Sequence, residues 1–117
     1  VPGGALVYNS TRDNIQIRDT ASTFRNLSPV VAFATVDSGS LVSTDGHNLA
    51  LSNSSKDANF TFSTALQSAN YTVMVSVGST TESYTVPEAQ KQTTGFRITF
   101  NPSDADTQSY TVMILQV

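Results

Sequence analysis

Tyr-Thr-Val-Met occurs twice in this chain, at residues 71–74 and again at residues 110–113, and each copy opens an apolar run. Each copy also follows a short run of alternating aromatic or β-branched residues, Phe60-Thr61-Phe62 in the first unit and Ile98-Thr99-Phe100 in the second. The Phe that ends each run precedes the Tyr by nine residues in the first unit and by ten in the second. Alternation with a period of two is typical of β-strands. Two strand–connector–strand units of this kind predict an antiparallel β-sandwich.

The remaining strands of the sandwich are expected from residue 30 onward. Residues 30–35 are almost continuously apolar, which suits a central strand, and segments 41–43 and 48–51 flank Thr44-Asp45-Gly46-His47. Asp-Gly is a strong hairpin signal, so we expect a turn there. Further strands are expected at 60–62, 71–77, 83–86, 96–100 and 109–116, with 63–69 and 87–94 as loops. One core cluster should contain Phe60, Phe62, Val73, Val75, Ile98, Phe100, Val112 and Ile114.

The N-terminal 29 residues have a different plan. A short apolar strand at residues 4–9 is followed by a polar turn at 10–14 and by a strictly alternating strand at 14–18. A third short strand is expected at 24–27 and ends before Pro29, because proline cannot donate to a strand ladder. We therefore expect an N-terminal β-hairpin segment at 1–29 and a sandwich domain at 30–117. The predicted fold is all-β, an antiparallel and jelly-roll-like sandwich preceded by a hairpin.

The last strand is apolar on both of its faces. Val112 and Ile114 share one face, and Met113 and Leu115 share the other. A strand with this pattern is usually buried on both sides. Since a two-layer sandwich covers only one face of each sheet, we predict that Met113 and Leu115 lie in an interface between subunits. The alternative is that the N-terminal hairpin covers this face.

Composition excludes several classes of function. Charged residues make up 13% of the chain, against about 25% in an average soluble domain, while Ser and Thr account for about a quarter. The net charge is −3 and the six Lys and Arg residues are scattered, so we expect no nucleic-acid partner. The sequence has no apolar run of about 18 residues, so we expect no membrane insertion.

The absence of cysteine excludes disulfides and thiolate metal sites. Such a domain needs another source of stability, and we expect it to oligomerise. No signal peptide is visible at the start of the sequence. Because the chain starts at Val1 without Met, we expect processing or a longer parent protein.

Candidate catalytic and metal-binding residues are few. His47 lies beside Asp45, and Ser43 or Ser52 could complete a Ser-His-Asp set, but a turn explains the same residues more simply. Asp104-Ala105-Asp106 is the one close acidic pair, and a calcium loop would need further oxygen ligands at defined positions. We therefore expect no catalytic residue, no metal site and no cofactor.

Two stretches of the chain resemble structural proteins of tailed phages. The three N-terminal strands are similar to a tail-fibre hairpin that reads Gly-x-x-x-Tyr-Asn, then Asn-x-Leu/Ile-Gln-x-Tyr, then Trp-x-x-Leu. Here Phe24 stands in the place of Trp, and Arg18 follows Ile17 where Tyr is usual. Residues 60–74 are similar to a Phe-Thr-x-Ala-x-x-x-Ala-Asn-Tyr-x-Val segment of fibre-tip domains. The two stretches, residues 4–27 and 60–74, together cover about one third of the chain.

The resemblance implies a non-enzymatic, homotrimeric module of the virion, assembled in the host cytoplasm with other virion proteins. We expect a tail-fibre tip that recognises host polysaccharide or an outer-membrane protein through loops at one end of the sandwich, at 43–48, 53–57, 79–84 and 88–94. The candidate contact residues are Asp45, His47, Asn48 and Tyr84. One alternative is a trimeric decoration or cement protein that stabilises the capsid. Another is a secreted bacterial carbohydrate-binding or adhesin domain.

Overall fold

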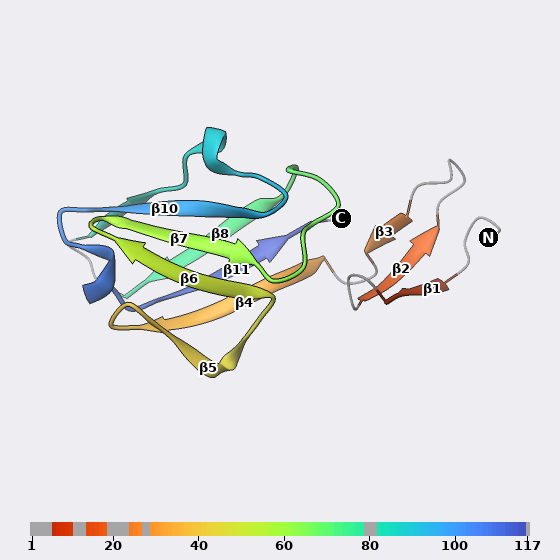
Figure 1. Cartoon of the computed structure of the whole chain (residues 1–117), viewed down its shortest axis with the longest axis horizontal. Coiled ribbons are helices and arrows are strands. Elements are labelled where there is room, and N and C mark those ends of the chain that lie inside the picture. Colours follow the sequence, from red (N-terminus) through yellow and green to blue (C-terminus); the bar gives the residue numbers. More distant parts are fainter. Residues whose placement is uncertain (1–5, 11–13, 19–23, 27–28, 79–81, 117) are drawn as a thin grey trace.

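The computed structural model describes residues 6–10, 14–18, 24–26, 29–78 and 82–116. The strands form three antiparallel sheets (Figure 1), and the described residues contain two short 3-10 turns and no α-helix. These turns are η1 at Glu88–Gln90 and η2 at Ala105–Thr107. The expected all-β class is confirmed. No helix in the described part of the chain is long and apolar enough to cross a membrane.

Two four-stranded sheets face each other and form the sandwich. The sheet with the order β5-β4-β11-β8, called the β4 sheet below, consists of Ser40–His47, Val30–Asp37, Tyr110–Leu115 and Thr72–Val77. The sheet with the order β6-β7-β10-β9, called the β7 sheet below, consists of Leu49–Ser54, Asp57–Phe62, Gly95–Asn101 and Ser83–Thr85. The antiparallel β-sandwich predicted from the sequence is therefore present.

The N-terminal strands form a separate three-stranded sheet. β1 (Leu6–Asn9), β2 (Asn14–Arg18) and β3 (Phe24–Asn26) lie in that order, beyond one end of the sandwich (Figure 1). The expected boundary at residue 29 falls between β3 and β4. The buried Gln16 side chain donates from Nε2 to Oε1 of Gln67, in the connection between β7 and β8. Residues 4, 5, 27, 79–81 and 117, which were assigned to strands or a loop, lie outside the described residues.

The sequence repeat is also a structural repeat. The two Tyr-Thr-Val-Met copies lead into β8 and β11, which pair antiparallel with Met74 directly opposite Met113. The runs that precede them lie in β7 and β10, which pair with Phe60 opposite Phe96. Each unit thus gives one strand to each sheet, and the two units lie side by side in both layers.

The predicted core cluster is confirmed. Six of its eight members are buried and the other two, Val73 and Val75, are partly buried against it. Aromatic rings fill the space between the sheets: Phe60 stacks on Phe96 with ring centroids 5.0 Å apart, and Phe100 lies 5.0 Å from Tyr110. Inward positions alternate along every central strand, as a sandwich requires.

The strand order differs from the expected jelly-roll-like arrangement. In a jelly roll the chain winds as two Greek keys, and strands that follow each other in sequence are rarely neighbours in the same sheet. Here β4–β5, β6–β7 and β9–β10 are hairpin pairs that each stay within one sheet. The turns that close two of these hairpins explain the difference, because short two-residue loops hold neighbouring strands in the same sheet.

The turn predicted at residues 44–47 is also wrong. These residues belong to β5, and Gly46 lies opposite Ala34 in the ladder. The tight hairpin turn is instead at Ser38 and Gly39, whose φ angles of 47° and 79° suit a turn with both central residues in the left-handed region. A Cβ at Gly39 would also meet the backbone of Asp106 at 2.4 Å, so Gly is required there. Asp-Gly was thus a misleading signal: Gly46 pairs with Ala34, and Asp45 lies in the stretch of β5 where the register with β4 shifts.

Candidate interaction surface

Four residues form one row across the outer face of the β4 sheet. His47 lies opposite Phe33, Phe33 opposite Met113, and Met113 opposite Met74. Residues directly opposite each other on neighbouring strands project to the same side of a sheet. Phe33, Met113 and Met74 are 40%, 38% and 52% exposed, and they are three of the four exposed large hydrophobic residues in the described part of the chain. We call these four residues the apolar row.

Strand alternation explains why these side chains point outward. In β4 the small residues Ala32 and Ala34 are buried on either side of Phe33, and in β11 Val112 and Ile114 are buried on either side of Met113. Successive side chains of a strand point to opposite faces of the sheet. Because the buried residues face the β7 sheet, the residues between them must point outward. Met113 therefore lies on a second apolar face, as the sequence predicted, and its place in a subunit interface stays a prediction.

The N-terminal sheet does not cover the apolar row. Figure 1 shows β1, β2 and β3 beyond the end of the sandwich, and Met113 and Phe33 remain exposed. The alternative in which the hairpin covers this face is therefore wrong. Leu115, the other predicted interface residue, is half-buried after a bulge in the β11–β4 ladder. It lies opposite Thr72, in the row next to Met113, and its role in an interface also stays a prediction.

Uncharged side chains flank the row. On one side lie Thr35, Thr111 and Ser76, which are directly opposite one another on β4, β11 and β8. The acidic groups of this sheet lie at its margins, with Asp37 at the end of β4 and Asp45 on the edge strand β5. The His47 ring lies 6.1 Å from the Phe33 ring, at the outer end of the row. The centre of this face is therefore apolar and neutral.

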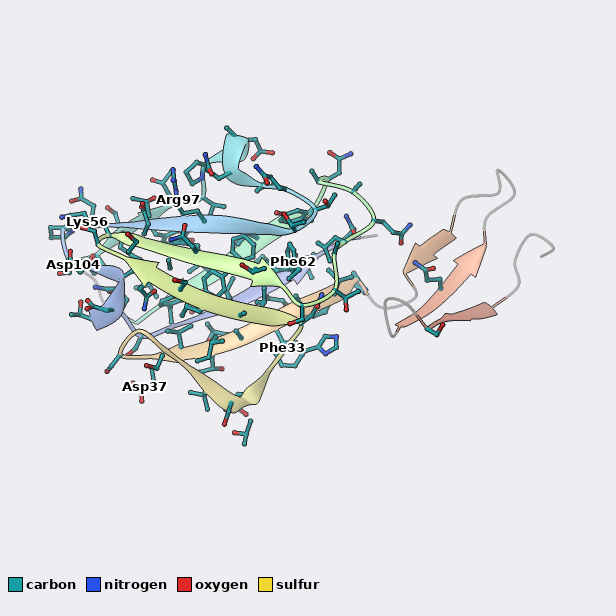
Figure 2. The ribbon with its side chains drawn as sticks, viewed as in Figure 1. Phe33, Asp37, Lys56, Phe62, Arg97 and Asp104 are labelled. Atoms are coloured by element: carbon teal, nitrogen blue, oxygen red, sulfur yellow. The ribbon has the colours of Figure 1, made fainter. Side chains whose placement is uncertain are left out.

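The outer face of the β7 sheet has the opposite chemistry. Thr99 Oγ1 donates to Asp57 Oδ1 at 2.8 Å, and Arg97 Nε lies 4.0 Å from the same oxygen. Asn59 lies opposite Arg97 in the ladder. Figure 2 shows Arg97 on the outer side of β10, with Phe62 in the interior and Phe33 on the far side of the sandwich. This face is therefore polar and carries charges of both signs.

The structure brings together three of the four predicted contact residues. Asp45 and His47 are exposed on β5, and Asn48 follows at the corner between β5 and β6. Asn48 has φ 62°, and its amide is engaged with Thr64: Nδ2 donates to the Thr64 carbonyl at 3.1 Å, and Oδ1 accepts from the Thr64 amide at 2.6 Å. This amide fixes the corner against the loop, which makes Asn48 a structural residue.

Tyr84 lies elsewhere. The β7 sheet has two edge strands, β6 and β9. The corner that holds the other three residues joins β5 to β6, whereas Tyr84 is on β9, at the opposite edge. Its hydroxyl donates to the Val75 carbonyl at 3.2 Å and so joins the two sheets at their open side. The ring is exposed, but the hydroxyl has a structural partner.

The expected clustering of the four loops at one end is wrong. The corner at Asn48 and the turn at Ser55 lie at opposite ends of the single strand β6, so segments 43–48 and 53–57 cannot share an end. Charged residues gather at the end farther from the N-terminal sheet, where Figure 2 places Asp37, Lys56 and Asp104. Two chemically different ends result, and neither collects all the predicted contacts.

The acidic pair forms part of a turn, as expected. The Asp104 carbonyl accepts from the Thr107 amide and from its hydroxyl, at 3.3 and 2.8 Å, around η2. Within the described ranges, no group of three or more His, Cys, Asp or Glu residues is placed to hold a metal ion.

An open depression of about 610 Å³ lies beside the end of β11, near η1. Lys91 Nζ is 5.3 Å from the centre of the Tyr71 ring and 3.1 Å from Glu88 Oε1. Because the cation already has an anionic partner, this depression offers little free charge to a ligand.

Sequence reasoning found Met113 but missed Phe33 and Met74. A signal for both was present: Phe33 stands between two alanines in an alternating strand, and Met74 occupies the same place in its tetrapeptide as Met113. Register across the sheet, which the sequence does not encode locally, was needed to join them into a row. No protein-family model, curated protein or solved structure matches this chain.

Proposed function

We propose that this chain is a non-enzymatic structural module of a tailed-phage virion, a homotrimer at the tip of a tail fibre that recognises the host surface. The observation that carries the proposal is the apolar row on an otherwise neutral sheet face. Exposed contiguous apolar residues on a small domain mark an interaction site. The threefold number, the virion and the fibre come from the sequence resemblance of the hairpin and of residues 60–74.

Host recognition would use the surface that remains free around the row. The exposed parts of the sandwich are rich in hydroxyl and amide groups, which can hydrogen-bond sugar hydroxyls. Asp45 on the edge strand β5 is the best candidate among the four predicted contacts, because its side chain is exposed and lies outside the apolar row. His47 is exposed too, but it stands at the outer end of that row. Asn48 and Tyr84 hold the fold through Thr64 and Val75, so changes there would lower stability as well.

Two measurements test the proposal. Antibodies against the chain should label the distal ends of the tail fibres on intact particles of the phage that encodes it. Soluble protein should compete with that phage for adsorption to host cells. Asp45→Ala should weaken this competition without lowering the midpoint of thermal unfolding, since exposed residues contribute little to stability.

Other outcomes would replace the proposal. Labelling of the head, with binding of soluble protein to emptied capsids and not to cells, would assign the chain to capsid decoration. Binding to cells without any labelling of particles would favour a secreted adhesin or carbohydrate-binding domain. A measured turnover of host polysaccharide by the purified protein would contradict its non-enzymatic character.

A further inference from the structure

We infer that the outer face of the β4 sheet is the surface on which copies of this chain pack, around an axis parallel to the strands and with all N-terminal sheets at one end. The inference deepens the proposed function, on which the number three and the shared direction rest. The choice of face rests on the apolar row alone.

The chemistry of the face suits a second copy of the same chain. Phe33, Met113 and Met74 are flanked by Thr and Ser side chains, so two such faces can meet without bringing like charges together. The outer face of the β7 sheet, by contrast, carries the charged residues Asp57 and Arg97. Met side chains are unbranched and adapt to irregular neighbours, which favours contact between identical faces.

The size of the face is adequate for assembly. Four strands about 4.8 Å apart and six residues long, at about 3.3 Å per residue, make a face of about 15–20 Å on each side. With side-chain relief this offers several hundred Å² per copy, on the order of the roughly 800 Å² that each partner buries in a standard interface. The row lies at the centre of this area, where interface residues contribute most to affinity.

The direction of the axis follows from the shape of the chain. The strands of the β4 sheet run along the longest dimension of the molecule, 51 Å, and the N-terminal sheet extends beyond one end (Figure 1). Rotation about an axis parallel to the strands keeps the N-terminal sheets of all copies together. A two-fold axis perpendicular to the strands would place them at opposite ends, so the position of the N-terminal sheets distinguishes the two arrangements.

The absence of cysteine makes a direct test possible, because a single introduced thiol can pair only with its copy in another subunit. Met113→Cys should form an inter-chain disulfide on mild oxidation, in up to two thirds of the chains, since the third copy of a trimer has no free partner. Thr61→Cys, exposed on the outer face of the β7 sheet, is the matched control and should remain unlinked. Cross-linking of the control with none at Met113 would overturn the inference.

Sedimentation equilibrium gives a second test. The wild-type protein should have three times the chain mass of 12.5 kDa at micromolar concentration. Met113→Asp should raise the concentration needed for assembly at least about a hundredfold, because an unpaired charge is left in a dry interface. Thr61→Asp should not change it. Where Met113→Asp fails to fold, Met113→Ser serves, with a smaller rise expected. A wild-type monomer, or a trimer unaffected by either Met113 variant, would contradict the inference.

The direction of packing has its own readout. Ser10, exposed in the N-terminal segment, can be changed to Cys and labelled with a donor or an acceptor dye. Energy transfer within mixed assemblies should be efficient if the N-terminal sheets lie together, and weak transfer would overturn the parallel axis. The inferred packing face and the proposed function can be contradicted independently. If the chain assembles through Met113 but antibodies do not label the particles, the packing face is supported and the tail-fibre function is not. If antibodies label the fibre tips but the disulfide forms through Thr61→Cys, the function is supported and the packing face is wrong.

Discussion

The outer faces of the two sheets differ far more than their inner faces. Both sheets place alternating apolar residues in one shared core, but the β7 sheet turns Arg97, Asp57 and Thr99 outward, whereas the β4 sheet turns Phe33 and Met113 outward. Inward positions are constrained by packing, since a sandwich buries one face of each sheet. Outward positions are free of that constraint and can therefore carry a function.

Two central strands illustrate the difference. β10 lies between β7 and β9 and its sequence alternates between apolar and polar residues; β11 lies between β4 and β8 and is apolar at nearly every position. Both strands are equally central, so depth in the sheet does not explain the contrast. A continuous apolar strand in a two-layer sandwich thus indicates a second face that needs cover.

The largest expected effect separates inner from outer aromatic residues. Phe100 is fully buried against Tyr110, so Phe100→Ala should lower the free energy of unfolding by about 3–5 kcal/mol. Phe33→Ala, in a variant kept monomeric by Met113→Asp, should lower it by less than about 1 kcal/mol. Urea unfolding followed by circular dichroism measures both. Equal losses would mean that Phe33 is part of the core and that the two faces do not differ as described.

A smaller effect compares glycines in the two sheets. A Cβ at Gly95, in the β7 sheet, would lie 2.2 Å from the Phe60 carbonyl oxygen, whereas at Gly46, in the β4 sheet, the nearest atom would be 3.5 Å away. Gly95→Ala should therefore destabilise the protein by about 1–3 kcal/mol, because β7 and β10 must move apart. Gly46→Ala should be nearly neutral, and Gly78→Ala, with nothing nearby, is a second control. Thermal unfolding of the three variants checks this order.

Much of the fold could be predicted from the sequence because alternation is a local signal. The repeated tetrapeptides, the core phenylalanines and the three N-terminal strands were placed correctly where the structure describes them. The jelly-roll-like arrangement and the turn at residues 44–47 were not. Both depend on long-range pairing, which decides whether Asp45-Gly46 closes a hairpin or continues a strand.

The candidate surface was predictable only in part for the same reason. Met113 was identified from one strand, but joining it to Phe33 and Met74 required the register of three strands. The contact residues were chosen as exposed turn residues, and tertiary hydrogen bonds to Thr64 and Val75 gave Asn48 and Tyr84 structural roles instead. The sequence does not show which polar side chains in loops will form tertiary hydrogen bonds and which will stay free to bind a partner.

A pH measurement tests how the two sheets are joined. The Tyr71 hydroxyl, just before β8, donates to the carbonyls of Gln92 and Gly95 at 2.9 and 3.0 Å, and so links the β4 sheet to the start of β10. Burial, assisted by the negative charge of Glu88, raises the pKa of Tyr71 to about 12. In the unfolded chain the phenol ionises near its ordinary pKa of about 10. The stabilisation is therefore complete below pH 10 and is lost as the pH rises toward 12.

Unfolding free energies between pH 9 and pH 12 should accordingly fall for the wild-type protein, and less steeply for Tyr71→Phe. Some decline should remain in the variant, because burial also raises the pKa of Tyr110. Identical slopes for the two proteins would show that Tyr71 ionises equally in the folded and unfolded chains. The hydrogen bonds from Tyr71 to the Gln92 and Gly95 carbonyls would then not contribute to the free energy of unfolding.

The smallest expected effect lies on the polar face. Asp57 accepts from Thr99 Oγ1 and lies 4.0 Å from Arg97 Nε, and both charged side chains are about one third exposed. Asp57→Asn keeps an oxygen that Thr99 can reach and removes only the charge. The loss should therefore stay below about 1 kcal/mol and shrink further in high salt, as for other exposed ion pairs. Sedimentation of this variant should match the wild type, because the β7 sheet faces water in the packing inferred here. A change in assembly on removing this single charge, with none on changing Met113, would reverse the assignment of the two faces.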